Sequence, residues 1–208
     1  MGGGNVKRTN LKTFEIQDFQ SMSSFPNDIV KDLHCLFNSY CNLVKDDGIL
    51  DYQEFLLMMN KSDCIITQQI FKGLDNNKDN QINFREFLKF ISCFVNGTNN
   101  EKINLTFKIF ANEETKLIEK NKMIEILKSS LQLNKLLDDY LDEKIIEEIV
   151  KITFDKFDLC SNEVNGINLD EYKKFVEKNP GILNWFKIDL QKIRSTMKDK
   201  INNTGCFG

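Results

Sequence analysis

Stripes of apolar residues at helical spacing recur along the chain, and each stripe is followed by a polar loop and a second stripe. The first stripe places these residues on one face of a helix: Ile29, Leu33, Leu36, Phe37 and Tyr40. An aromatic residue precedes each of four loops, namely Phe37, Phe71, Phe107 and Phe154. An aliphatic residue lies inside each loop, namely Leu50, Ile82, Ile118 and Ile167. The pattern predicts an all-α fold built from four helix-loop-helix units.

Repeated units of this size cannot bury their apolar faces alone and therefore pack against one another. We expect loop two to pair with loop one and loop four with loop three, which gives two lobes. The expected domains are a flexible N-terminal tail over 1–24, a first pair of units over 25–97, a second pair over 101–180, and a C-terminal amphipathic helix and tail over 181–208.

An additional amphipathic helix is expected near the C-terminus, after the helix breakers Pro180 and Gly181. Its apolar positions recur every three or four residues and are Leu183, Phe186, Leu190, Ile193, Met197 and Ile201. We expect this helix to cover the hydrophobic groove of the second lobe and to compete there with a partner helix. A helix that only completes the core is the alternative.

The second loop, from Asp75 to Glu86, carries oxygen-bearing side chains at alternate positions. Such side chains point toward one centre in a tight loop, and a carboxylate on the following helix can close the ligand shell with both oxygens. Asn80 stands at the sixth position, where asparagine tolerates left-handed backbone better than most residues. The candidate calcium ligands are Asp75, Asn77, Asp79, Gln81 and Glu86. This loop resembles the calcium loop of the EF-hand family.

The other loops depart from this pattern. The aromatic and aliphatic positions of units two and three are separated by 11 residues, whereas those of units one and four are separated by 13. Loop three begins at Ala111, which has no ligand, and places the cation of Lys122 where the closing carboxylate belongs. Loop one keeps Glu54 but begins at Cys41 with few oxygen-bearing side chains. We expect loops one and three to be empty.

Loop four keeps a carboxylate at each end but carries two extra residues. The candidate ligands are Asp158, Asn162 and Glu171. The insertion breaks the regular spacing of the ligands, so a folded loop without metal that pairs with loop three is the alternative.

Several stretches beyond the loops resemble the branch of EF-hand proteins that contains calcineurin B, the neuronal calcium sensors and calaxin. These stretches include 70–75, 90–94, 101–110 and 126–131, and the resemblance extends over residues 25 to 186. It implies a protein that binds Ca²⁺ and regulates a target protein through a target helix. A dynein or docking subunit, a phosphatase and a kinase are the partners that the resemblance implies.

The N-terminal residues resemble a myristoylation signal, a feature of calcineurin B and the neuronal sensors. Gly2 follows Met1, and Lys7 and Arg8 follow shortly after, but Val6 stands where Ser or Thr is usual. An unmodified flexible tail is the alternative. Contact with a membrane is expected only if Gly2 is acylated, and one acyl chain binds a membrane only marginally.

Composition excludes several classes of function. The charge of −3, from 28 basic and 31 acidic residues, gives no field that would attract nucleic acid. The single His34 rules out most catalytic and metal sites built from several imidazoles. No nucleophile–base pair or phosphate-binding loop appears, so we expect no enzyme. The six scattered cysteines and the lack of a secretory leader favour reduced thiols and a cytoplasmic location. The resemblance to calaxin implies an axonemal site as one option, and acylation of Gly2 would imply a peripheral membrane site.

Two functional hypotheses remain. The first is a calcium-binding EF-hand regulatory or adaptor protein that binds its target in a calcium-modulated way. The second is a constitutive structural or regulatory subunit, similar to a light chain or to calcineurin B, with mostly inactive EF-hands. A change of exposed hydrophobic surface on calcium binding would distinguish them.

Overall fold

The computed structural model describes residues 11–41, 43, 45, 47–59, 63–133, 144, 147–148, 150–152 and 166–179. Apart from two very short strands and one isolated bridge, the regular structure in these ranges is helical. The all-α fold class predicted from the sequence is therefore confirmed. No helix in the described part of the chain is both long enough and apolar enough to cross a bilayer.

The chain divides into two compact units. The first takes its described residues from Met1–Met59 and Leu74–Gly97, and the second from Asn60–Gly73 and Thr98–Trp185. The helices of unit 1 are α1 (Thr13–Ser23), α2 (Asn27–Cys41), α3 (Tyr52–Met59) and α5 (Phe84–Asn96). The elements of unit 2 are α4 (Ile65–Leu74), α6 (Asn99–Phe110), β1 (Ile118–Glu119), α7 (Lys120–Leu133), β2 (Gly166–Ile167) and α9 (Leu169–Lys178). Unit 2 contains α4 only up to Gly73, because Leu74 belongs to unit 1.

The boundaries of the two predicted lobes stay a proposal. The compact units share the division next to Gly97, but unit 1 omits 60–73, which the proposal places in the first lobe. The repeat pattern and the compact units therefore describe two different groupings of the same helices.

The four aliphatic loop positions form the backbone pairing that the sequence predicts. Leu50 and Ile82 exchange two hydrogen bonds, each with an N···O distance of 2.9 Å. Ile118 of β1 pairs with Ile167 of β2 in an antiparallel register. All four side chains are almost completely buried. The pairing of loop two with loop one, and of loop four with loop three, is confirmed at these positions.

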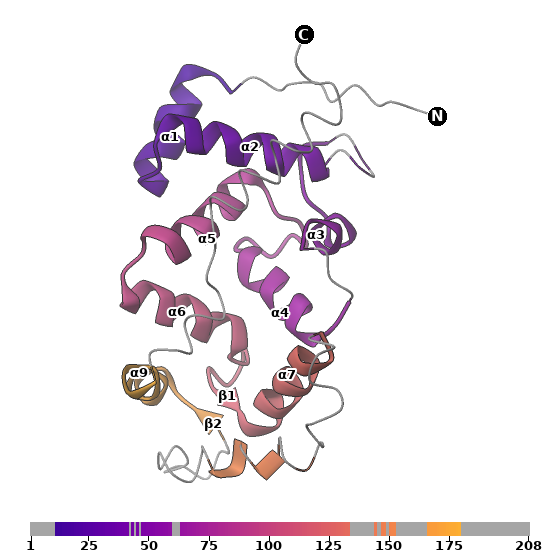
Figure 1. Ribbon diagram of the computed structural model, residues 1–208, viewed down its shortest axis with the longest axis vertical. Coiled ribbons are helices and arrows are strands. Elements are labelled where there is room, and N and C mark those ends of the chain that lie inside the picture. Colours follow the sequence, from indigo (N-terminus) through magenta and orange to yellow (C-terminus); the bar gives the residue numbers. More distant parts are fainter. Residues whose placement is uncertain are drawn as a thin grey trace. The chain divides into compact units, whose positions relative to one another are not determined.

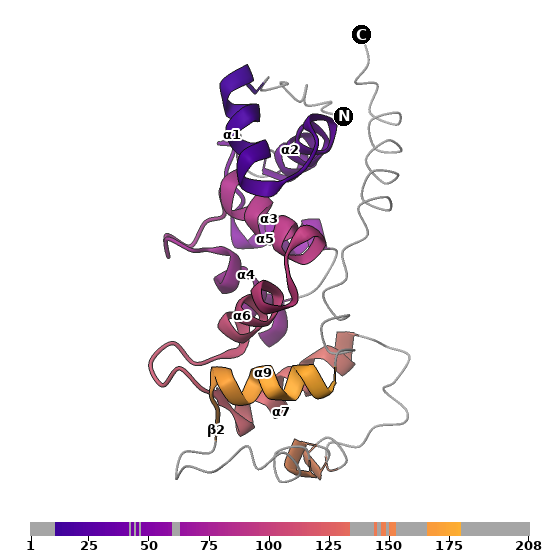
Figure 2. The same cartoon turned by 90° about the vertical axis from the view of Figure 1, so that its left-hand side faces the viewer.

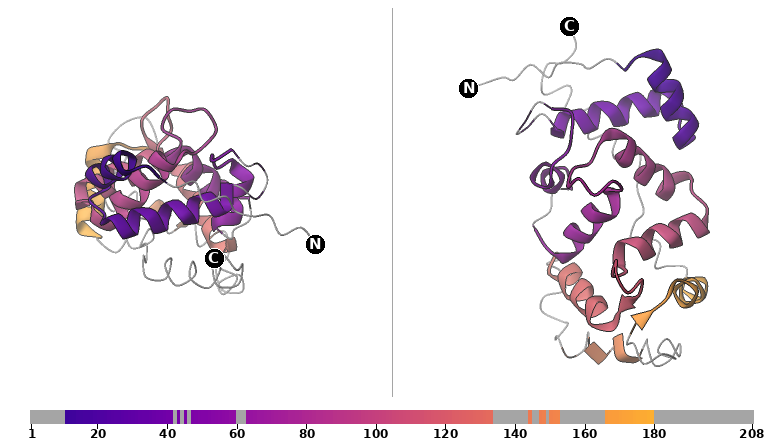
Figure 3. Two further views of the ribbon diagram at one scale, coloured as in Figure 1. Left: turned by 90° about the horizontal axis from the view of Figure 1, so that it is seen from above. Right: turned by 180° about the vertical axis from the view of Figure 1, so that it is seen from behind.

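Helix α1 corrects the expectation of a flexible tail over 1–24, because residues 13–23 are helical and pack against α2 and α5 (Figure 1; Figure 3). Ser92 and Asn96 of α5 both donate to the carbonyl oxygen of Ser23, over 2.7 and 3.0 Å. Ile16 is buried, whereas Phe14 is 64% exposed. The apolar stripe of α1 is too weak to predict this helix from sequence. Contacts with α5 hold the helix in place.

Aromatic rings join α5 to the other helices of unit 1. The ring of Phe84 lies edge-on to the rings of Phe19, His34 and Phe37, with centroids 4.9, 4.8 and 5.6 Å away. Phe84 and Phe37 are both buried. The first turn of α5 is therefore fixed against α1 and α2 by one aromatic cluster, which we call the Phe84 cluster and which comprises Phe19, His34, Phe37 and Phe84.

We expect unit 1 to lose stability as the pH falls below the ordinary His34 pKa of 6.5. Burial lowers the pKa of His34 in the folded chain, and the nearby charge of Glu15 opposes this shift only in part. The unfolded chain then binds a proton more readily than the folded chain, so acidification favours unfolding. Urea titrations at about pH 7.5 and about pH 5.5 measure the difference in the free energy of unfolding.

The substitution His34→Gln isolates the contribution of this imidazole from that of the carboxylates. It should reduce the loss of stability between the two pH values, because the side chain no longer titrates. An unchanged loss in the His34→Gln variant would show that other groups cause the acid sensitivity.

In unit 2, helix α6 packs against α9, which begins directly after β2 (Figure 2). Tyr172 of α9 is buried, and its hydroxyl donates to the Thr106 hydroxyl oxygen of α6 over 3.1 Å. The ring of Phe107 lies 5.7 Å from that of Tyr172. This contact joins the helix before loop three to the helix after loop four.

Candidate metal centre

Loop two connects the end of α4 to the start of α5, and two residues of it adopt left-handed backbone. The φ angle is 62° at Lys78 and 61° at Asn80. The left-handed conformation predicted for Asn80 is confirmed. The left-handed backbone at these two residues keeps the loop tight, so that its polar side chains stay close to one another.

Each end of loop two carries a buried carboxylate that accepts backbone hydrogen bonds from the loop. Asp75 is 7% exposed and accepts from the N–H groups of Asp79 and Asn80, over 3.2 and 2.8 Å. Glu86 is 9% exposed, and its Oε1 accepts from the N–H groups of Asn76 and Asn77, over 2.9 and 3.3 Å. The first and last predicted ligands therefore lie at the two ends of one closed loop.

The middle of the loop is occupied by Asn77 and Asp79. The amide nitrogen of Asn77 donates to Asp79 Oδ2 over 2.8 Å, and the backbone N–H of Gln81 donates to Asp79 Oδ1 over 2.9 Å. The side-chain oxygen of Asn77 accepts from the N–H of Asp79 over 3.2 Å. The residues predicted to bind calcium are thus joined by hydrogen bonds within one short segment.

The donor set of loop two fits a hard cation. Its candidate ligands are carboxylate, amide and carbonyl oxygens, which suit Ca²⁺ and Mg²⁺ rather than metals that prefer thiolate or imidazole. In the described ranges, no three His, Cys, Asp or Glu side chains gather as a metal site, and the loop carboxylates accept N–H groups. Each carboxylate oxygen has more than one lone pair, so Asp75, Asp79 and Glu86 can accept these N–H groups and still offer oxygens to a cation.

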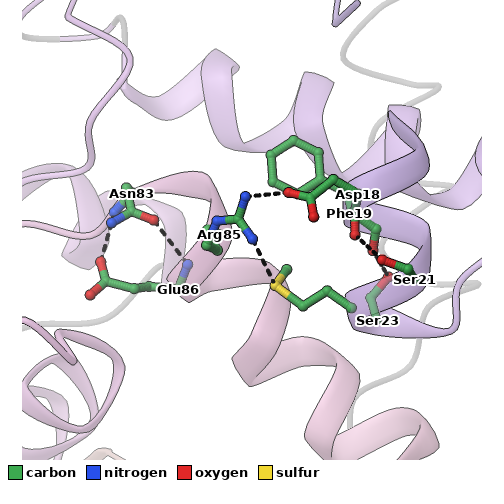
Figure 4. Close-up of polar contacts among 8 residues, drawn as sticks. Asp18, Phe19, Ser21, Ser23, Asn83, Arg85 and Glu86 are labelled. Carbon is green, nitrogen blue, oxygen red and sulfur yellow. Dashed lines mark hydrogen bonds and ion pairs between the residues drawn. The ribbon is translucent and has the colours of Figure 1, made fainter. Parts of the chain in front are cut away.

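Glu86 has a second role that the ligand pattern alone did not reveal. Asn83 Oδ1 accepts from the Glu86 N–H over 3.0 Å, and Glu86 Oε2 accepts from the Asn83 N–H over 3.1 Å, which is a capping box (Figure 4). Asp51 with Glu54 and Asn168 with Glu171 repeat this reciprocal pair. The sequence signal is Asn or Asp followed three residues later by Glu. Loops one, two and four carry it.

The residue beside Glu86 links the loop to α1. Arg85 forms an ion pair with Asp18, lies 5.5 Å from the centroid of the Phe19 ring and contacts Met22 Sδ over 3.6 Å (Figure 4). Both charged side chains are about half exposed, so the ion pair itself contributes little stability. Together with the Phe84 cluster, these contacts fix the helix that follows loop two within unit 1.

Loop one closes on Glu54, which is 1% exposed. The Glu54 carboxylate accepts from the N–H groups of Asp51 and Lys45, over 3.1 and 3.5 Å. Cys41 at the start of the loop is fully buried, and desolvation, together with the charges of Glu54 and Asp47, raises its pKa to about 12. A neutral thiol is a poor ligand for a hard cation, which supports the prediction that loop one is empty.

Loop three uses its oxygens in internal hydrogen bonds. Asn112 Oδ1 accepts from the N–H of Glu114 over 2.8 Å, and Glu119 Oε1 accepts from the amide of Asn112 over 3.0 Å. Lys122, at the position of the closing ligand, forms an ion pair with Glu125 over 3.5 Å. The loop holds its shape without a closing carboxylate.

We expect loop three to stay empty at millimolar calcium, because Lys122 opposes a cation and Ala111 cannot bind one. Nuclear magnetic resonance can follow the backbone amides of Thr115 and Lys116 during a calcium titration. Their resonances should not move while those of loop two change. A saturable shift at Thr115 that tracks calcium concentration would contradict this prediction.

Other predicted positions lie partly or wholly outside the described residues. Asp158, Asn162, Gly2 and the expected helix over 183–201 fall in this group. Glu171 is described, and it caps α9 as given above. Calcium binding in loop four, acylation of Gly2 and the docking of the C-terminal helix stay predictions.

No family model matches the chain. It is similar to the calcium-binding protein NCSA of Dictyostelium discoideum, with 28% identity over 192 residues, which covers 86% of this chain and 95% of that protein. It is also similar to calcineurin B of Naegleria gruberi, with 24% identity and coverage of 72% and 89%. Calaxin of Bos taurus is 28% identical, with coverage of 74% and 76%.

Guanylyl cyclase-activating proteins of Lithobates pipiens and Gallus gallus match at 24–25% identity. The names of these relatives describe a calcium-binding protein, one component of calcineurin and activators of a cyclase, and none describes a catalyst. These relatives confirm the resemblance of the chain to EF-hand calcium sensors of the calaxin, calcineurin B and neuronal calcium sensor branch.

Proposed function

We propose that the chain binds Ca²⁺ in loop two and thereby modulates the binding of a target protein. The observation that carries this proposal is the arrangement of Asp75, Asn77, Asp79 and Glu86 in one closed loop, with both terminal carboxylates buried. The similarity to a protein named for calcium binding supports the same interpretation. With three carboxylates among the ligands, the dissociation constant should fall in the sensor range of about 10⁻⁷–10⁻⁵ M.

Calcium would act on the target through the apolar surface of unit 1. Calcium binding to sensor EF-hands changes the angle between the flanking helices and exposes apolar side chains. Phe55, Phe87 and Phe94 are buried, whereas Leu57 and Met59 on α3 are 53% and 38% exposed. A change in the angle between α4 and α5 would extend this partly exposed surface with side chains from the core.

A fluorescent dye that binds exposed apolar surface tests this proposal. Calcium should raise the dye fluorescence of the full chain, and a chelator should reverse the rise. The variant Glu86→Gln should show little response, because it lacks the closing carboxylate. If calorimetry detects calcium binding but the dye does not respond, the sensor proposal is wrong.

A constitutive subunit is the second candidate, and loop three favours it. There Lys122 pairs with Glu125, and the loop keeps its fold through internal hydrogen bonds. A chain whose loops hold their shape without metal can present a fixed surface to a target helix. This candidate predicts the same target affinity with calcium and with a chelator.

The partner is proposed from the relatives. Affinity capture from the source cell, with calcium and with a chelator, followed by identification of the captured proteins, addresses its class. A phosphatase or kinase supports a role similar to that of calcineurin B. A dynein or docking subunit supports a calaxin-like role and an axonemal location.

A further inference from the structure

His34, the single histidine of the chain, lies in the Phe84 cluster beside the helix that follows loop two. Its ring is half-buried and lies edge-on to the ring of Phe84, with centroids 4.8 Å apart. Phe84 is the first residue of α5 and stands two residues before Glu86, the candidate closing ligand. One imidazole therefore contacts the helical turn that carries the end of the calcium loop.

The neutral form of His34 fits this position better than the protonated form. Asn38 Nδ2, one turn further along α2, lies 3.3 Å from both ring nitrogens and donates to the one that carries no proton. A protonated imidazole has two N–H groups and no acceptor, so this hydrogen bond is lost. Burial also disfavours the charged ring and lowers the pKa of His34. A proton on His34 therefore disturbs its packing against Phe84.

Charged groups on the neighbouring helices offset this preference only in part. Glu15 of α1 raises the pKa of His34, but by less than burial lowers it. Asp18 of α1 and Arg85 of α5 form an ion pair with each other. Lys31, one turn before His34 on α2, is exposed, and its positive charge disfavours a second one at this spacing. The balance favours the neutral ring.

We propose that a proton on His34 and calcium in loop two oppose each other through Phe84. This inference rests on the proposed function, because it requires calcium to bind in loop two. Calcium holds Glu86 and with it the first turn of α5, which keeps Phe84 packed on the neutral ring. A proton on His34 disturbs that contact, so the turn presents Glu86 less well and calcium binds more weakly. All three residues lie in unit 1.

Nuclear magnetic resonance of the full chain tests this linkage directly, because a single histidine gives one set of ring-proton resonances. A pH titration without calcium and another at saturating calcium give the pKa of His34 in each state. Calcium should lower this pKa. By linkage, the lowering equals the ratio of the calcium affinities of the neutral and protonated chains, and we expect a ratio of about fivefold. An equal or higher pKa with calcium bound contradicts the proposal.

Calorimetry gives the reciprocal measurement, at pH values where circular dichroism shows a folded chain. From about pH 7.5 to about pH 5.5, calcium binding should weaken more in the unsubstituted chain than in His34→Gln. Both chains share the competition of protons for the loop carboxylates, but only the first can protonate residue 34. Equal weakening in the two chains would refute the linkage. If His34→Gln does not fold, the resonance titration decides the matter without it.

The variant Asn38→Asp should act in the opposite direction. Its carboxylate accepts a hydrogen bond from the protonated ring and attracts its charge, so the pKa of His34 should rise. Calcium binding should then begin to weaken at a higher pH than in the unsubstituted chain. A raised pKa without this change in calcium binding would show that His34 and loop two are not linked.

The substitution Phe84→Leu tests the route between the two sites. Leucine keeps an apolar side chain but lacks the ring, so the effect of calcium on the pKa of His34 should shrink. Phe14→Leu makes the same change at a position that is 64% exposed and should keep the full effect. An undiminished effect in Phe84→Leu would mean that Phe84 does not transmit it.

The outcomes separate this inference from the proposed function. If calorimetry at about pH 7.5 detects no calcium binding by the unsubstituted chain, both fail. If calcium binds and the dye responds, but the pKa of His34 is the same in both states, only the linkage is wrong and the calcium site stands.

Discussion

The substitution Glu86→Gln is expected to remove most calcium binding. The carboxylate of Glu86 is the closing ligand, and an amide offers one oxygen and no charge in its place. We expect the free energy of calcium binding to weaken by about 3 kcal/mol, which raises the dissociation constant roughly a hundredfold. The removal of one partner from a buried charge pair has a similar cost. Calorimetric titration of the full chain with calcium measures both the affinity and the stoichiometry.

Glutamine preserves the rest of the local structure, which makes the result interpretable. The capping box with Asn83 accepts Gln in place of Glu, so α5 should still begin at Phe84. Glu114→Gln is the matched control, because it removes the same charge from an exposed residue of loop three and should leave binding unchanged. Unchanged calcium stoichiometry in Glu86→Gln would place the site elsewhere in the chain.

Local patterns in the sequence were sufficient to predict the loops. The repeat of four units predicted that loop one pairs with loop two and loop three with loop four, and the aliphatic position inside each loop marks where Leu50 pairs with Ile82 and Ile118 with Ile167. The left-handed backbone at Asn80 followed from its sixth position in the loop and from the small set of residues that tolerate this conformation. The ligand identities remain predictions from the same spacing.

Contacts between distant residues could not be predicted in this way. Helix α1 has a weak apolar stripe of its own and is held by Arg85, Ser92 and Asn96, which lie more than sixty residues further along the chain. Gly73 of α4 meets Ile109 of α6, where a Cβ atom on Gly73 would lie 2.5 Å from Cγ1 of Ile109. Nothing in the local pattern around Thr13 or Gly73 identifies these partners.

The substitution Phe84→Ala is expected to destabilise unit 1 severely. The ring is buried and contacts Phe19, His34 and Phe37, which belong to α1 and α2. Removing it leaves a cavity where three helices meet, and such a change typically costs about 3–5 kcal/mol. Urea unfolding followed by circular dichroism should show this loss in the free energy of unfolding.

Phe14→Ala makes the same chemical change at an exposed position of α1 and serves as the control. Its side chain is 64% exposed, so the loss should stay within about 0.5 kcal/mol. Amide hydrogen exchange should locate the effect of Phe84→Ala: protection should fall at Val30 and Leu33 of α2, and Val176 of α9 should be less affected because it lies in unit 2. Because Phe84 stands two residues before Glu86, the variant should also bind calcium more weakly. Equal losses in the two alanine variants would mean that the Phe84 cluster does not hold α5 in place.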